Sequence, residues 1–296
     1  MSVTVAAGAA PCLSVLIPTY NQTVGVARIF ASLQPLRGCD GVEILVSDDS
    51  PNDGAAEQIA ATCAEFGGVR YIRNQPALGA VPNWNRLLDL AVGRYCLLLH
   101  HDEEIAASTD LARLVSALRA PGAPDAWILA CHVVREPGMS PQQHFPTAWA
   151  AWFARRCPTY MLRRNLIGPP SVLVVRRERY VRFDVRLRWL VDVDAYCRTF
   201  QHARDVRAWP SGGVISHRDV SNSVTAQLAP RLAQIEAAER ELLADRHAAE
   251  PGLRWLFTPT GASRALRAGE AGVWLVFRVA YRLRQRLARA AGMTQI

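Results

Sequence analysis

The chain contains no lysine, so all 34 of its basic residues are arginine. We attribute this bias to GC-rich codon usage and draw no functional class from it. The seven cysteines are odd in number and widely separated, and no two of them form a C-x-x-C pair. That spacing excludes a disulfide framework and a zinc module, and it predicts a reduced protein with buried thiols.

Long apolar runs and targeting signals are also missing. The first residues, MSVTVAAGAAP, have neither the basic start nor the long apolar centre of a signal peptide. Because no stretch is apolar for long enough to span a bilayer, we expect a cytoplasmic protein that does not cross a membrane. Half of the 296 residues are hydrophobic and 20% are charged, which excludes disorder throughout and provides for a large core.

Before residue 140, short apolar runs alternate with segments whose apolar residues have helical spacing. The runs predict strands at 13–20, 42–49, 69–74, 95–100 and 126–134. The segments between them predict helices at 23–36, 54–66, 81–93 and 108–120. This alternation indicates βαβ units and therefore an α/β fold with a mostly parallel sheet flanked by helices.

After residue 140 the alternation weakens. The sequence there predicts an aromatic and basic segment at 145–162, a strand at 171–175, a helix at 188–203, a hairpin at 206–217, and long helices at 226–250 and 272–290. We expect two domains, residues 1–225 and a basic helical extension over 226–296. Residues 253–296 contain eight arginines and one acid, Glu270, a charge of +7 that predicts contact with an anionic membrane or nucleic acid.

Polar side chains gather at three predicted strand ends. They are Thr19, Tyr20 and Asn21 after the first strand, Asp48 and Asp49 after the second, and His101, Asp102 and Glu103 after the fourth. In the stretch YCLLLHHDEEI, a buried strand runs directly into ionisable groups, whose burial without partners is costly. Parallel strands share their carboxyl edge, where ligands of open α/β sheets bind, so we expect these groups in one crevice.

The two common glycine-rich phosphate-binding motifs are absent. The first strand is followed by PTYNQT, where a dinucleotide site needs G-x-G-x-x-G, and there is no P-loop sequence. Carboxylates repel phosphate, so an acidic strand end holds a phosphate only through a bridging cation. Mg²⁺ and Mn²⁺ take oxygen ligands and often share them with a diphosphate. The residues therefore predict a divalent metal at Asp102 that binds a diphosphate.

Four stretches together resemble a known family. LSVLIPTYNQ, EILVSDDSPNDG, LGAVPNWNRLLDLAVGRYCLLLHHDEE and WLVDVDAYCR resemble family 2 glycosyltransferases of the GT-A fold, over about residues 13–225. The resemblance implies transfer of a sugar, with inversion, from a nucleoside-diphosphate donor, with a UDP-sugar favoured. The family's D-x-D metal motif reads His100-His101-Asp102 here, so His100 replaces the first aspartate and Asp102 matches the usual ligand.

The resemblance also implies roles for single residues. Tyr20 would stack on the donor base, Asp48 or Asp49 would bind the base or ribose, and Asn85 would support the site. The expected donor-binding set is completed by Pro18, Thr19, Asn21 and His101. Asp192 matches the catalytic base, and His217 matches a late histidine that some relatives direct at the diphosphate or metal.

Each assignment has a plainer alternative. Asp102 can be a solvated residue that caps the helix near Ser108, and the acids at 48 and 49 can be charges that favour a helix N-terminus. His217 can be an exposed loop residue. Asp192 and Asp194 lie two residues apart and point in different directions on a helix, so only one is expected to face the crevice.

The resemblance further implies an acceptor, a growing surface polysaccharide on a polyprenyl-type lipid carrier. The tail is then predicted to be an interfacial helix on the inner face of the cell membrane, since Trp274 and Tyr281 lie among its arginines. Nucleic-acid binding is not predicted, because no recognised motif accompanies the charge. Two other classes stay open: a nucleotide-sugar-binding protein without activity, and a metal-dependent phosphohydrolase.

Overall fold

The computed structural model describes residues 10–136, 138–217, 228–246 and 279. The chain divides into two units, Met1–Leu232 and Ala233–Ile296. The predicted domain boundary at 225/226 falls in a segment outside the described residues, as does nearly all of the predicted tail helix at 272–290. The first unit contains both sheets and every candidate site residue.

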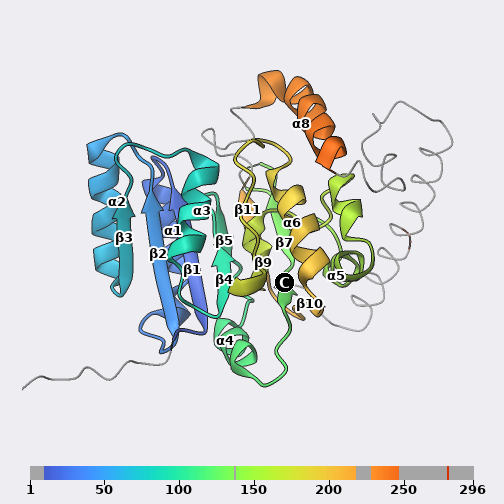
Figure 1. The fold of residues 1–296 in the computed structure, drawn as a ribbon. Helices are drawn as coiled ribbons and strands as arrows, with labels where there is room; N and C mark the ends of the chain where they lie inside the picture. The colour runs from blue at the N-terminus through green and yellow to red at the C-terminus, as the bar shows by residue number, and fades with distance from the viewer. Residues whose placement is uncertain (1–9, 137, 218–227, 247–278, 280–296) are drawn as a thin grey trace, which may run out of the picture. The chain divides into compact units, whose positions relative to one another are not determined.

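The first half of the chain forms the predicted alternation of strands and helices (Figure 1). Its strands are β1 Leu13–Thr19, β2 Val42–Asp48, β3 Val69–Arg73 and β4 Tyr95–Leu98. Its helices are α1 Thr23–Ser32, α2 Asp53–Phe66, α3 Ala80–Leu90 and α4 Leu111–Arg119, with a 3-10 turn at Gln34–Leu36. Asn52 caps α2 by accepting from the backbone N of Ala55 at 3.3 Å.

A seven-stranded sheet forms the centre of the first unit. Its order is β10-β6-β9-β4-β1-β2-β3, where β6 is Ala126–Ile128, β9 is Leu173–Arg176 and β10 is Val206–Ala208. Within this sheet β9 runs antiparallel to its neighbours β4 and β6, and the other pairs are parallel. All seven residues of β1 are buried, as expected for a central strand covered on both faces. The predicted mostly parallel sheet is confirmed.

A second sheet has the order β5-β11-β7-β8, with β5 at Glu103–Ile105, β7 at Cys131–Val134, β8 at Gln142–Gln143 and β11 at Val214–His217. Two predictions are therefore wrong. The strand expected at 126–134 is divided between the sheets, and the hairpin expected at 206–217 is two strands, β10 and β11, in different sheets. A Cβ on Gly213 would lie 2.2 Å from the Ala130 carbonyl oxygen, so glycine lets the two crossing segments pass closely.

Of the remaining described helices, the last two lie at predicted positions with shifted ends, and the first forms in the aromatic and basic segment at 145–162, where no helix was predicted. They are α5 Thr147–Arg156, α6 Val191–His202 and α8 Leu232–Arg246, with 3-10 turns at Pro158–Leu162, Pro170–Val172, Arg177–Arg179 and Ala229–Arg231. No helix of the described chain is both long and apolar enough to cross a bilayer. All seven cysteines lie in the described part; none forms a disulfide and five are buried.

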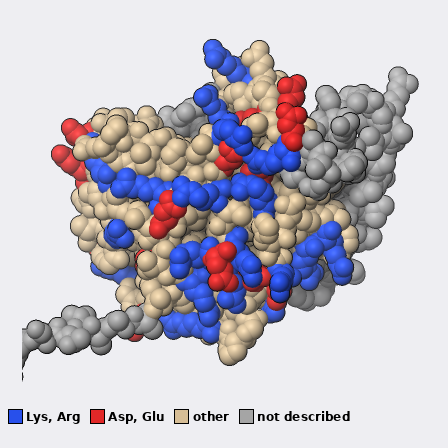
Figure 2. Space-filling model, viewed as in Figure 1, with Lys and Arg blue, Asp and Glu red and all other residues tan. Residues whose placement is uncertain are grey.

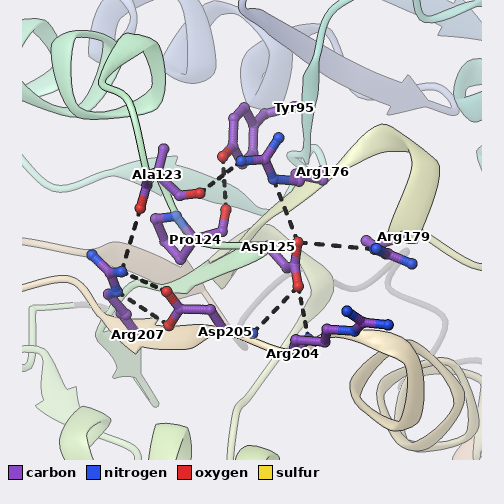
Figure 3. A network of polar contacts seen from close by, with 10 residues as sticks. Tyr95, Ala123, Pro124, Asp125, Arg176, Arg179, Arg204, Asp205 and Arg207 are labelled. Atoms are coloured by element: carbon purple, nitrogen blue, oxygen red, sulfur yellow. Dashed lines mark hydrogen bonds and ion pairs between the residues drawn. The ribbon is translucent and has the colours of Figure 1, made fainter.

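The amino end of β4 is fixed by a polar network (Figure 3). The Asp125 carboxylate accepts from the backbone N of Arg204 at 2.7 Å and lies 3.5 Å from Arg176 Nε. The Tyr95 hydroxyl, at the start of β4, donates to the Pro124 carbonyl at 2.7 Å. These contacts connect β4, β6, β9 and β10 at the edge of the sheet opposite the carboxyl ends of β1 and β4. They therefore stabilise the sheet at a place remote from the candidate site.

Candidate active site

The carboxyl ends of β1, β2 and β4 meet at one edge of the seven-stranded sheet, as Figure 1 shows. Thr19, the last residue of β1, lies opposite Asp48 in the parallel register. Leu98, the last residue of β4, lies opposite Leu16, so the following histidines reach the same edge. The backbone N of His217 on β11 donates to the Asp102 carbonyl at 2.9 Å, which places Asp102 between the two sheets.

The chain leaves β1 through a turn at Asn21. Asn21 has a φ of 51°, a left-handed conformation that asparagine tolerates better than most residues, and its backbone N donates to Ser50 Oγ at 2.8 Å. Tyr20 is 41% exposed, so its ring is accessible to a ligand. Thr19 Oγ1 and Asn21 Oδ1 are buried without a hydrogen-bond partner among the described residues. These atoms and the Tyr20 ring suit the predicted donor contact, which stays a prediction.

Asp48 and Asp49 are enclosed and hold other parts of the chain in place. Asp48 is fully buried and accepts from the backbone N of Ser50 at 2.9 Å and from the Tyr71 hydroxyl at 2.8 Å. Asp49 is also buried and accepts from three N–H groups of the segment 74–79, at 2.6 to 2.9 Å. Both acids thus position the strand end. Neither carboxylate is accessible in this conformation, and their predicted contact with the donor base or ribose stays a prediction.

The loop after β4 brings together three groups that can hold a cation. One ligand atom each from His100, Asp102 and Glu103 lie within 4.8 Å of one another. His100 Nε2 is buried and has no hydrogen-bond partner among the described residues. Carboxylate oxygen and imidazole nitrogen are both ligands of divalent cations in proteins. The residues present therefore fit a divalent metal at the predicted place, with Asp102 as one of its donors.

Burial sets the protonation of the groups around Asp102. Burial lowers the pKa of His100 to about 4, although the charge of Asp102 acts against this shift. Burial also lowers the pKa of His101, whose ring hydrogen-bonds to the Pro18 carbonyl. The pKa of Glu103 is raised well above its usual value by burial and by the nearby charge of Asp102. Both histidines are thus neutral, and Glu103 favours its protonated form when no cation is bound.

A glycine on α1 lets this loop lie close to the helix. A Cβ on Gly25 would lie 2.1 Å from the His101 carbonyl oxygen, far inside contact distance. Gly25 is buried and faces the loop from the first turn of α1. The helix that follows β1 therefore supports the backbone of the loop after β4 directly.

Asp192, in the first turn of α6, belongs to the same site although it lies 90 residues after Asp102 in the sequence. Burial and then the charge of Asp102 raise the pKa of Asp192 to about 7. Asp192 in turn raises the pKa of Glu103. The charge of the predicted metal ligand Asp102 thus acts on the predicted base Asp192. A carboxyl group that titrates near neutral pH is suited to accept a proton.

Asp194 has a different task. It is fully buried, and its Oδ2 accepts from Nε and Nη2 of Arg198 at 2.9 and 2.5 Å. Arg198 also donates to the Arg182 carbonyl at 2.9 Å, in the segment leading to α6. The alternative of a solvated helix face is therefore wrong for Asp194, which holds α6 against the chain that precedes it.

Asn85 supports the site without facing it. Its side chain donates to the Phe183 carbonyl at 2.9 Å and accepts from the Phe183 backbone N at 2.8 Å, so both ends of the amide bind protein. The Phe183 ring packs edge-on against Trp84 at 5.3 Å, and Trp84 packs against the His100 ring at 4.6 Å. Asn85 thus fixes a stack of rings that ends at His100, which suits the supporting role predicted for it, and that role stays a prediction.

His217 approaches the site through its backbone. Its ring Nε2 lies 3.0 Å from Glu104 Oε1, so the side chain is paired with an acid of β5. The predicted contact with a metal or diphosphate would require this pair to open. It stays a prediction, because the segment after His217 lies outside the described residues.

The sequence did not assign roles to His100, Glu103 or Trp84. The run HHDEE indicated that Glu103 lies near the site. Spacing along the chain could not show that its carboxylate turns back toward its own loop. Trp84 lies on α3. Its ring is half-buried against His100, a contact between α3 and the β4 loop that no local pattern contains.

The comparison with protein families shows to which family the chain belongs. The family model described as glycosyl transferase family 2 matches residues 14–178, more than half of the chain. The chain belongs to glycosyl transferase family 2. The match includes β1, β2, the β4 loop and α3, and it ends before Asp192.

Curated relatives of this family 2 chain match only in part. An uncharacterized Mycobacterium tuberculosis protein is 29% identical over 204 residues, 64% of this chain and 62% of that protein. A Campylobacter jejuni GalNAc(5)-diNAcBac-PP-undecaprenol beta-1,3-glucosyltransferase is 32% identical over 96 residues, 32% of this chain and 31% of that protein. The chain thus spans less than two thirds of the length of either relative.

Solved structures share the fold of this family 2 chain at low identity. TarS from S. aureus, residues 1–349 in complex with UDP-GlcNAc, has a TM-score of 0.54 at 17% identity, over 80% of this chain and 73% of that one. A mannosyltransferase from Pyrobaculum calidifontis, in complex with GDP-Man and Mn²⁺, has a TM-score of 0.50 at 16% identity, over 96% and 84%. The expected GT-A fold is confirmed by these neighbours.

Proposed function

We propose that this chain transfers a sugar, with inversion, from a nucleoside-diphosphate donor to an acceptor hydroxyl. The observation that carries the proposal is the meeting of Asp192 with the His100–Asp102–Glu103 group at the carboxyl edge of the sheet. Family membership and neighbours bound to UDP-GlcNAc and GDP-Man support a nucleotide-sugar donor. We favour a UDP-sugar as the donor. We assign the binding of its nucleobase to the part of the sheet edge that includes Tyr20 and Asn21.

The residues divide the reaction between them. A divalent cation, Mg²⁺ or Mn²⁺, held by Asp102 would neutralise the charge that builds on the leaving diphosphate, so no general acid is needed. Asp192 accepts the proton of the acceptor hydroxyl while the oxygen of that hydroxyl attacks the anomeric carbon. The bond from that carbon to the diphosphate oxygen breaks on the opposite face, which inverts the configuration. Asp194 and Asn85 keep α6 and the β4 loop in position.

The acceptor is assigned to a glycan on a polyprenyl-type lipid, so the chain acts at the inner face of the cell membrane as a peripheral protein. The named activity of the Campylobacter relative, on a PP-undecaprenol substrate, supports this assignment. The basic tail from residue 253 onward is one proposed contact with anionic lipid. Figure 2 shows that basic side chains far exceed acidic ones on the face in view, in keeping with the net charge of +8.

Helix α5 is a second proposed contact with the lipid surface. Its buried side is made of alanines, whereas Trp149 and Trp152 are each 41% exposed and Arg155 and Arg156 follow in the last turn. From residue 137 to residue 177 the sequence has six arginines and no acid. Tryptophan favours the headgroup region of a bilayer and arginine is drawn to anionic lipid, so this composition complements an anionic membrane.

The alternatives differ in what they do to the donor. A binding protein without activity would bind nucleoside diphosphates and leave a nucleotide sugar intact. A phosphohydrolase would cleave simple phosphate esters without a sugar acceptor. The test is a screen of nucleotide sugars with Mg²⁺ or Mn²⁺, in which release of the nucleoside diphosphate is followed. Release from one donor, but none of phosphate from a simple ester, is the expected result; an intact donor throughout would reject the transferase.

A further inference from the structure

The ligand group in the β4 loop contains a nitrogen donor where the family pattern has a carboxylate. His100 stands at the first position of the D-x-D motif, and its side chain is 14% exposed. Its Nε2 has no hydrogen-bond partner among the described residues, whereas a buried polar atom normally has one. With Asp102 and Glu103 it makes a group whose ligand atoms lie within 4.8 Å of one another. An imidazole nitrogen beside two carboxyl groups is the donor set of a mixed nitrogen–oxygen metal site, and His100 Nδ1 lies 3.7 Å from Glu103 Oε2.

The His100 ring is held in place from outside the loop. Trp84 packs against it at 4.6 Å between centroids, and Phe183 packs edge-on against Trp84 at 5.3 Å. Asn85 binds both backbone groups of Phe183, which fixes the position of that ring. Groups that orient an imidazole in this way strengthen its binding to a metal, because the ring loses less conformational freedom when the metal binds.

Nitrogen and oxygen ligands select different cations. Mg²⁺ is a hard ion that takes oxygen ligands in near-octahedral geometry, whereas imidazole suits transition metals. Resting on the proposed function, we infer that His100 is itself a metal ligand, and that it makes this site select Mn²⁺ over Mg²⁺. An aspartate at the same place would accept both ions more evenly. The exchange of one residue in the motif thus determines which cation accompanies the donor.

The test compares the full-length chain with its His100→Asp and His100→Gln variants. Mn²⁺ binding is measured by the loss of the free-ion paramagnetic resonance signal, and Mg²⁺ binding by competition, each with and without UDP. His202→Asp makes the same exchange at an exposed histidine in the last turn of α6 and serves as the control. Thermal unfolding without metal shows whether each variant is folded. His100→Gln keeps the size and replaces nitrogen by an uncharged oxygen, so it remains informative if His100→Asp does not fold.

We expect the ratio of Mn²⁺ to Mg²⁺ affinity to fall by at least about tenfold in both variants. Removal of a group that supports a metal site typically lowers metal affinity by about 10- to 100-fold, and we take the smaller figure. The ratio should not change in His202→Asp. An unchanged ratio in folded His100→Asp or His100→Gln overturns the inference and leaves the proposed sugar transfer untouched. If the wild-type chain binds neither ion, with or without UDP, the inference fails together with the proposed metal. Sugar transfer without added metal would then still support the transferase.

Discussion

At the scale of single residues, the site depends on carboxyl groups given different environments. Asp48, Asp49 and Asp194 are fully engaged with protein donors and act as structural groups. Asp102 and Asp192 are the acids to which we assign chemical roles, and the charge of Asp102 contributes to the raised pKa of Asp192. The sequence placed all five near the site. It assigned the base to Asp192 and not to Asp194, but it did not show that Asp49 is enclosed, because the donors that engage Asp49 come from the distant segment 74–79.

The raised pKa of Asp192 predicts how the transfer rate depends on pH. Asp192 accepts a proton only as a carboxylate, so kcat/KM should rise with pH up to the pKa, about 7, and then level off. A cation at Asp102 offsets the charge that raises this pKa, so with metal bound the midpoint should lie at or below 7. Rates measured from pH 4.5 to 8.5 with saturating metal check this. A rate that declines as pH rises through this range would show that Asp192 is not the base.

The ion pair of Asp194 with Arg198 predicts a loss of stability without a loss of chemistry. Asp194→Asn leaves the partly buried Arg198 without its counter-charge, which should lower the free energy of unfolding by about 1–3 kcal/mol in urea titrations. Asp205→Asn is the matched control, since its pair with Arg207 is largely exposed and should change stability by less than about 1 kcal/mol. A folded Asp194→Asn chain that transfers no sugar would instead make Asp194 the base.

At the scale of elements, the short connections carry as much of the site as the helices and strands. The β4 loop continues into β5, which pairs with β11 of the second sheet, so the second sheet fixes the backbone around Asp102. Helix α3 fixes the ring of His100, and α1 approaches the same loop through Gly25. Four elements therefore converge on the stretch from His100 to Glu103, which accounts for ionisable groups at the end of a buried strand.

Helix α5 predicts a lipid-binding defect that can be separated from catalysis. Arg155→Glu reverses a charge on the proposed lipid face and should lower binding of the full-length chain to phosphatidylglycerol vesicles by roughly tenfold at low salt. Trp152→Ala should weaken binding further by removing an exposed indole. Arg70→Glu, an exposed position on β3, is the control and should bind like the wild type. Sedimentation with vesicles measures all three, and equal binding by Arg155→Glu and Arg70→Glu would remove α5 from the interface.

At the scale of the whole molecule, local patterns predicted the architecture of the first half, and distant contacts determined the second. The apolar runs of β1, β2 and β4 can be recognised directly, because each is a short and mostly buried strand bounded by polar residues. The run from 126 to 134 reads as one strand, yet its two halves join different sheets where Gly213 passes Ala130. The nearby β10 and β11 were expected to pair with each other for the same reason. Pairing partners are set by the entire fold, so spacing along the chain does not contain them.

The central claim is that the chain catalyses sugar transfer with Asp102 serving the metal and Asp192 serving the acceptor. The most direct measurement sets donor affinity by calorimetry beside transfer rate, for the wild type, Asp102→Asn and Asp192→Asn, with metal present. Asp102→Asn removes an anionic ligand, so it should weaken metal-dependent donor binding and lower transfer together. Asp192→Asn should leave donor binding nearly unchanged and lower transfer by roughly 10²- to 10⁴-fold, as expected for a lost general base. Transfer by Asp192→Asn at the wild-type rate, or donor binding by Asp102→Asn at the wild-type affinity, would contradict the account.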